Sequence, residues 1–124
     1  MNLVAIMLAT CVAFILGMVW YAGLFGDVWF QEAGISKEKA SMKPIFESFF
    51  YALLAAWGFD TLMPFIHSLQ EALYFGLIVG IVFIGTSLKM NYQFLGKSHK
   101  LFLIDAGYHV MQFALYALIF WYVK

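Results

Sequence analysis

Four polar side chains recur at helical spacing in the last apolar stretch of the sequence. Asp105, His109, Gln112 and Tyr116 follow one another at intervals of three or four residues, so on a helix they form a single stripe. An acid placed one turn before an imidazole can orient it or favour its charged form. Because ionisable groups within lipid face the interior of a bundle, we expect this stripe to face inward and to carry whatever chemistry the protein performs.

Further polar side chains lie at the same depth at the ends of other apolar stretches. Lys89 is the basic residue placed to neutralise Asp105. The hydroxyl groups of Thr86, Ser87 and Tyr21 are placed to bond His109. The candidate binding residues are therefore Asp105, His109, Gln112, Tyr21, Trp20, Lys89, Thr86 and Ser87. Two interpretations stay open. The residues form either a polar pocket that passes a proton or binds a polar head, or an interhelical clasp whose bonds contribute ~0.6 kcal/mol each on average.

The composition places these residues in a membrane. Of the 124 residues, 65% are hydrophobic and 11% are charged, whereas a soluble domain has ~25% charged residues. A soluble enzyme and a nucleic-acid-binding protein are therefore excluded. Only closed backbone hydrogen bonding is stable in lipid, so we expect an all-α fold, a four-helix transmembrane antiparallel bundle that forms a single domain over residues 1–124. The expected spans are at about 3–25, 48–64, 69–90 and 101–123.

The distribution of lysines predicts the orientation. Six lysines lie close to the span ends in the first and third loops, and only Lys124 and the amino terminus lie on the other face. The positive-inside rule then places loops 26–47 and 91–100 in the cytoplasm and both termini on the non-cytoplasmic side of a cell inner membrane. Within the first loop, the segment from Asp27 to Ala33 is expected to be a short interfacial helix that ends at Gly34.

Small residues recur every fourth position in three of the expected spans. Such rows let helix backbones approach closely in lipid, and here we interpret them first as packing within one chain. A homodimer or a larger membrane complex also stays open, with the lipid bilayer as the general partner. The rows are Ala5, Ala9, Ala13 and Gly17; Ser48, Ala52 and Ala56; and Ala72, Gly76 and Gly80.

Several chemistries fail on residue count. Cys11 is the only cysteine, so Cys-pair redox chemistry is excluded. His109 is the only histidine well inside a span, whereas a haem carrier of this size needs pairs of axial histidines on facing helices. A zinc site needs three or four ligands, and the polar stripe offers two. No catalytic residues, metal or cofactor are therefore expected, and the protein is not expected to be an enzyme.

Two segments resemble the signatures of a known family. Gly17–Tyr21 with Leu24–Gly26 and Trp29 resembles its first-span signature, and Phe94–Gly96 followed by Lys100–His109 resembles its last. The family is the bacterial domain-of-unknown-function family seventeen sixty-one, made of small four-span integral membrane proteins, and the likeness covers essentially the whole chain. It implies no activity, but it singles out Trp20, Tyr21, Asp105 and His109. The family pattern usually has Ser-Pro where this chain has Ala22-Gly23.

The functional expectation is a small integral membrane protein that acts as a non-enzymatic accessory or packing subunit. Very short hydrophilic segments, small-residue rows and the lack of a catalytic set favour this interpretation. The alternative is a proton- or small-solute-coupled membrane carrier that uses Asp105 and His109 as an inner-leaflet polar site.

Overall fold

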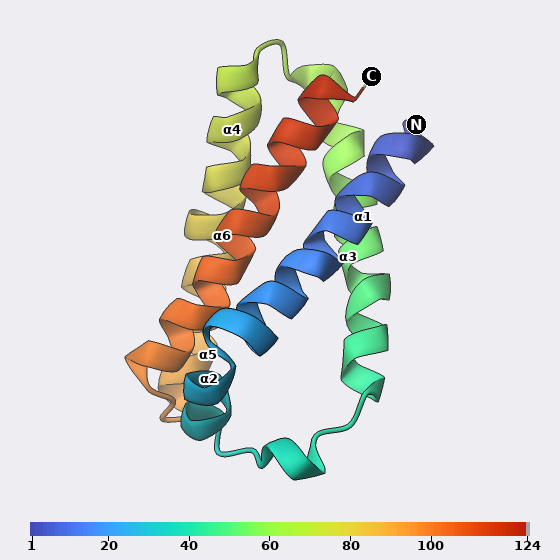
Figure 1. Ribbon diagram of the computed structural model, residues 1–124. Helices are drawn as coiled ribbons and strands as arrows, with labels where there is room; N and C mark the ends of the chain where they lie inside the picture. Colours follow the sequence, from blue (N-terminus) through green and yellow to red (C-terminus); the bar gives the residue numbers. More distant parts are fainter. Residues whose placement is uncertain (124) are drawn as a thin grey trace.

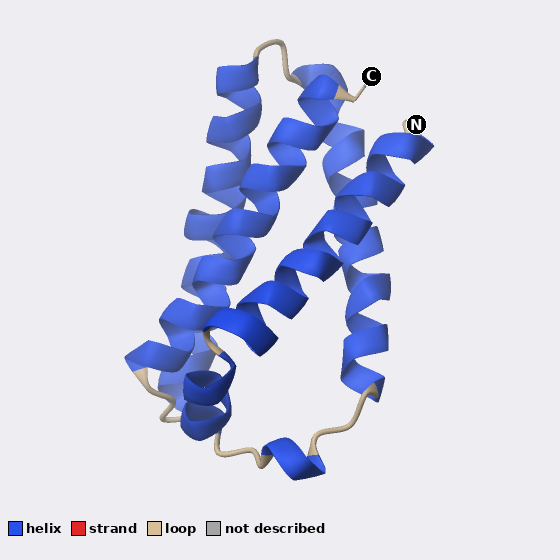
Figure 2. Ribbon diagram, in the orientation of Figure 1, coloured by secondary structure: helices blue, strands red, loops and turns tan. Residues whose placement is uncertain are grey.

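The computed structural model describes residues 1–123, and within them every regular element is a helix (Figure 2). Two of the long helices contain π-helical segments, which are rare and are often found at functional sites. The elements are α1 (Leu3–Met18), η1 (π, Val19–Leu24), α2 (Gly26–Ala33), η2 (3-10, Lys37–Lys39), α3 (Lys43–Leu62), η3 (3-10, Met63–Phe65), α4 (Leu69–Leu77), η4 (π, Ile78–Gly85), α5 (Thr86–Phe94) and α6 (His99–Tyr122).

Three continuous helices in the described chain are long and apolar enough to cross a membrane. They are Leu3–Leu24, Leu69–Phe94 and His99–Tyr122, and their bounds lie within four residues of the first, third and fourth expected segments. The helix α3 is 20 residues long but falls outside these three, and it carries Glu47 and Asp60. It begins about one turn before the expected segment because Pro44 occupies its first turn. Proline suits this position, since backbone N–H groups of the first turn have no partner within the helix and the missing one costs no hydrogen bond.

The long helices pack in the order α4, α6, α1 and α3, with α6 between α4 and α1 (Figure 1). Both termini lie at one end of this bundle, and α2 and α5 lie at the other. The terminal end is held by Asn2, whose backbone N–H donates to Asp60 Oδ1 at 3.3 Å and whose side-chain amide donates to the Val123 carbonyl at 2.7 Å. One residue therefore joins the start of α1 to the ends of α3 and α6.

The rows of small residues are used for packing within the chain. Ala5, Ala9 and Ala56 are completely or almost completely buried. A Cβ atom added to Gly76 would lie 2.5 Å from the Phe113 carbonyl oxygen, so the backbones of α4 and α6 touch directly. The alanines of these rows and Gly76 and Gly80 are buried within the chain, because small side chains let helix faces approach closely. Ser48 instead is exposed and donates to the Pro44 carbonyl of its own helix.

Aromatic side chains fill the terminal half of the bundle. The ring of Phe59 on α3 stacks on Phe120 with centroids 5.6 Å apart and meets Phe75 edge-on at 5.7 Å. Offset and edge-to-face pairs of this kind add to the stabilisation gained from burial. The terminal half of the bundle is thus fixed by ring packing as well as by the hydrogen bonds of Asn2.

The helix α2 confirms the expected short helix in the first loop. It spans Gly26–Ala33 and ends at Gly34, whose φ of 73° is in the left-handed region. Glycine is favoured there because it has no Cβ to clash. Instead of extending from the bundle, α2 packs against α6, which brings its aromatic side chains to the polar end.

Candidate functional site

The carboxylate of Asp105 is the centre of the polar end of the bundle. Its Oδ1 accepts hydrogen bonds from the Tyr21 hydroxyl at 2.6 Å and from the Trp29 indole N–H at 2.9 Å. Its Oδ2 accepts a bond from the Tyr92 hydroxyl. An ionised carboxylate is acceptor-only and has room for all three, and bonds to a charged acceptor are roughly twice as strong as neutral ones. Three neutral donors therefore compensate the withdrawal of this group from water.

These three donors come from three different elements. Tyr21 belongs to η1, Trp29 to α2 and Tyr92 to α5, and Asp105 itself lies one to two turns inside α6. One side chain thus connects the polar ends of the helices Leu3–Leu24, Leu69–Phe94 and His99–Tyr122 and also fixes α2. We call Asp105, Tyr21, Trp29 and Tyr92 the carboxylate cluster.

The fold-back of α2 onto this cluster depends on Gly26. A Cβ atom at this position would lie 2.4 Å from the Tyr21 carbonyl oxygen, a separation that real Cβ atoms essentially never show. With no side chain at Gly26, the chain turns sharply after η1 and presents Trp29 to Asp105. The rings of Tyr21 and Trp29 then meet edge-on, with centroids 5.8 Å apart.

Two more aromatic side chains donate to backbone carbonyls across the contact between the helix Leu3–Leu24 and α6. The Trp20 indole N–H donates to the Ile104 carbonyl at 2.9 Å, and the Tyr108 hydroxyl donates to the Ala13 carbonyl at 2.9 Å. Gly107 gives Trp20 its space, because a Cβ atom there would lie 3.1 Å from the Trp20 ring. Trp20 and Tyr21 of η1 therefore fit closely against the Asp105–Tyr108 segment of α6.

His109 belongs to a separate chain of hydrogen bonds. Its Nδ1 lies 2.8 Å from Gln112 Oε1, the Gln112 amide donates to the Tyr116 hydroxyl at 3.0 Å, and that hydroxyl donates to the Ala52 carbonyl at 2.9 Å. Because each link after His109 donates onward, Gln112 Oε1 is left as an acceptor, and the proton of the imidazole belongs on Nδ1. We call His109, Gln112 and Tyr116 the amide chain; it links α6 to α3.

The structure places the other predicted residues differently from expectation. Lys89, expected near Asp105, has its Nζ 2.7 Å from His99 Nδ1 and 5.1 Å from the centre of the Phe102 ring. Thr86 donates back to the Val82 and Phe83 carbonyls of its own helix, and Ser87 is exposed. Their depth in the membrane predicts that Lys89 meets Asp105 and that Thr86 and Ser87 meet His109. Depth does not specify the direction in which a side chain leaves its helix.

Trp29 was missed as a member of the site, and so was the role of Tyr92. The sequence places Trp29 in an aromatic group typical of a membrane–water interface, and Tyr92 at the depth of Asp105 without a partner. The one available signal was Gly26, three residues before Trp29, since glycine between a helical span and an aromatic helix allows a sharp turn. Tyr21, expected to bond His109, bonds Asp105 instead, and Trp20 lies beside this pair on the Ile104 carbonyl. Asp105 was expected to orient His109, but the imidazole bonds Gln112, because the carboxylate is turned toward its aromatic donors.

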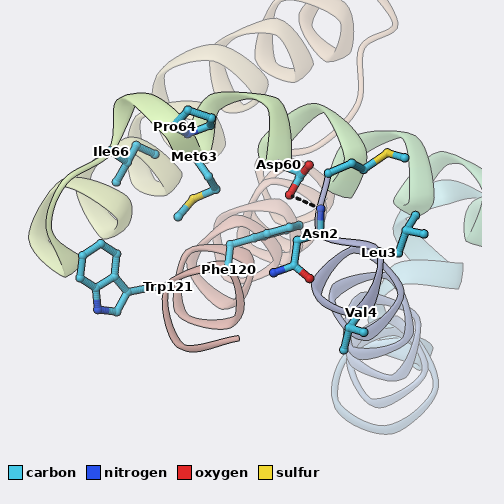
Figure 3. Close-up of a pocket in the computed structure, with 10 residues that line it drawn as sticks. Asn2, Leu3, Val4, Asp60, Met63, Pro64, Ile66, Phe120 and Trp121 are labelled. Atoms are coloured by element: carbon cyan, nitrogen blue, oxygen red, sulfur yellow. Dashed lines mark hydrogen bonds between the residues drawn. The ribbon is translucent and has the colours of Figure 1, made fainter. Parts of the chain in front are cut away.

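A hollow of about 660 Å³ lies at the opposite end of the molecule, among the ends of α1, α3 and α6 (Figure 3). Its acidic side chain is Asp60, which the Asn2 backbone holds. Its other lining side chains are largely apolar, among them Met63, Ile66 and Phe120. Among the described residues, no three His, Cys, Asp or Glu side chains lie close enough to hold a metal ion. The carboxylate cluster therefore remains the most developed polar site.

Apolar helices that join around a hydrogen-bonded carboxylate define a small helical protein of membrane type. The particular family follows from comparison: a model described as "Protein of unknown function (DUF1761)" matches residues 4–121, so the chain belongs to this family. The resemblance of the first-span and last-span signatures is thereby confirmed, and both signatures meet in the carboxylate cluster. No curated protein and no solved structure matches the chain.

Proposed function

We propose that the protein is a non-enzymatic accessory or packing subunit of the bacterial inner membrane, in which Asp105 acts as a structural clasp. The observation that carries this proposal is the set of three bonds from Tyr21, Trp29 and Tyr92 to one carboxylate. Every polar atom that approaches Asp105 in these bonds comes from a different helical element. The arrangement suits a group that fixes helix positions.

The proposed topology has four crossings. The helix α3 supplies the fourth: it is 20 residues long, about 30 Å at 1.5 Å per residue, with its first turn, which carries the Lys43–Glu47 ion pair, at the cytoplasmic surface and the rest in the hydrocarbon core. Loops 26–47 and 91–100 then face the cytoplasm, and both termini face the other side, as the lysines favour. The shared position of the two termini at one end of the bundle supports this arrangement.

The exposed side of α3 supports a role in assembly. This helix packs mainly against α1, and a row of large side chains at helical spacing stays exposed along its length: Phe46, Phe50, Leu54 and Trp57. An apolar row of this kind on a peripheral helix offers a partner helix a surface for close packing. Tyr74, on α4 at the far side of the bundle, is similarly exposed and serves as a reference position.

The test combines purification with site-specific crosslinking. After extraction in mild detergent, a stable complex with other membrane proteins is expected, and a photo-crosslinking residue at Phe50 should label those partners. The same residue at Tyr74 should label them much more weakly. A solitary monomer or a pure homodimer, with equal labelling from Phe50 and Tyr74, would contradict the proposal.

The carrier alternative makes a distinct demand. It requires proton exchange between Asp105 and His109, whereas the bonds of Asp105 run to three aromatic donors and those of His109 run to Gln112. Purified protein in proteoliposomes provides the comparison. A proton-coupled flux that Asp105→Asn abolishes while the variant stays folded would favour the carrier over the clasp.

A further inference from the structure

A groove of about 400 Å³ runs along the outside of the bundle, between the second half of Leu69–Phe94 and the first half of α6. Gly80, Gly85 and Ala106 line it and are buried, whereas Ile81 and Leu103 line it and are exposed. The small residues therefore form the floor and the large ones form the rims. Apart from Thr86 and Lys89, every residue that lines the groove is apolar, so the groove suits a hydrocarbon chain.

The groove ends at a positively charged group. Lys89 lines it, with its ammonium over the Phe102 ring and next to the His99 imidazole. The ion pairs of residues 1–123 join Lys37 to Asp27 and Lys43 to Glu47, so no acid within the described chain neutralises Lys89. This end lies at the turn between α5 and α6, which is also the more polar end of the bundle.

We propose that the groove binds one anionic phospholipid, with an acyl chain along the floor and the phosphate at Lys89 and His99. An apolar trough that ends in an uncompensated cation is complementary to an amphiphile with a negative head, and basic pockets between transmembrane helices on the cytoplasmic side bind such headgroups. The inference rests on the proposed position of α5 and α6 at the membrane surface, but it requires no partner protein.

Lipid retention by the purified protein tests the charged end of the groove. Native mass spectrometry from mild detergent should show more bound phosphatidylglycerol than phosphatidylcholine of the same chain length. Lys89→Gln should lower phosphatidylglycerol retention about fivefold, the factor expected for one lysine at a membrane surface, and Lys89→Arg should restore it. Lys97→Gln is the matched control, because its ammonium lies 3.4 Å from the Ala33 carbonyl and does not line the groove.

A second variant tests the apolar part. Leu103 is 65% exposed, so Leu103→Trp should fill the groove and displace the lipid while the bundle stays folded. Soluble glycerol phosphate, the headgroup without chains, should not compete. Equal retention of the two lipids, equal effects of Lys89→Gln and Lys97→Gln, or competition by glycerol phosphate would each overturn the proposal. Co-purification of partners is a separate readout, so the lipid site and the accessory role can fail independently.

Discussion

The Trp29 indole donates to the Asp105 carboxylate at 2.9 Å although the two residues are 76 positions apart. This bond closes the polar end of the bundle, because Trp29 lies on the short helix α2 and Asp105 on the last long helix. Tyr21 and Tyr92 share the same carboxylate. A group of neutral aromatic donors around one acid is thus the organising contact of the site.

The glycine at the start of α2 should be sensitive to a single methyl group. In Gly26→Ala, the new Cβ would collide with the Tyr21 carbonyl oxygen, so η1 and α2 must separate and Trp29 must move away from Asp105. We expect a loss of about 1–3 kcal/mol in the free energy of unfolding, typical of overpacking. Gly23→Ala is the matched control, since nothing lies within 4 Å of its Cβ position. Thermal unfolding in detergent measures both, and equal midpoints would contradict the assigned role of Gly26.

Removal of the indole donor should loosen α2 locally. Trp29→Phe keeps an aromatic ring beside Tyr21 but loses the bond to Asp105, at an expected cost of about 1.5–3 kcal/mol for a bond to a charged group. Hydrogen exchange of the α2 amides should become faster. Trp57→Phe, at an exposed position of α3, should leave α2 exchange unchanged. Identical exchange in the two variants would show that Trp29 does not anchor α2.

The carboxylate cluster and the amide chain should act independently. Asp105 and His109 lie one helical turn apart, but their bonds lead to different residues. The coupling between Asp105→Asn and His109→Gln in the free energy of unfolding should therefore stay below about 0.5 kcal/mol, the lower end for groups that share one hydrogen-bond network. Unfolding midpoints of the four proteins measure the coupling. A coupling free energy well above this limit would indicate a joint acid–imidazole unit, as the carrier alternative requires.

The exposed ion pair of the first loop should respond to pH with a defined sign. Lys37 donates to Asp27 and its charge holds the pKa of that carboxyl below its ordinary value. A carboxyl with a lowered folded-state pKa adds stability above its unfolded-state pKa, and this stability is lost as the pH falls through the folded-state value. The effect should be small because both groups are exposed. Titration of the Asp27 carboxyl by NMR should show that Lys37→Gln raises its pKa; no change would exclude the pair in solution.

The helices themselves follow from simple features of the sequence. Apolar runs give the long helices, and the spacing of Ala72, Gly76 and Gly80 gives the close approach of α4 to α6, because both depend on local pattern. Gly34 gives the end of α2 for the same reason. The expected inner position of Asp105 also follows, since an acid in an apolar helix must find partners.

The identity of those partners could not be derived in the same way. Lys89 and Tyr92 lie within one turn of each other, and charge favours Lys89 as the neighbour of Asp105. The structure instead directs Tyr92 to the acid and Lys89 to His99 and Phe102. Neutral donors are less costly to desolvate than an ammonium group, and the direction of each side chain depends on helix rotation, which includes the π-helical segment η4. The contact of Trp29 with Asp105 could not be predicted, because it depends on the sharp turn between η1 and α2.

A double-mutant cycle between Tyr21 and Asp105 measures whether Asp105 joins the helices as a structural clasp. The free energy of unfolding is measured for the native protein, Tyr21→Phe, Asp105→Ala, which removes the acceptor, and the double variant. We expect a coupling of about 1 kcal/mol or more, because the two groups share a 2.6 Å bond. Losses that simply add would contradict the account.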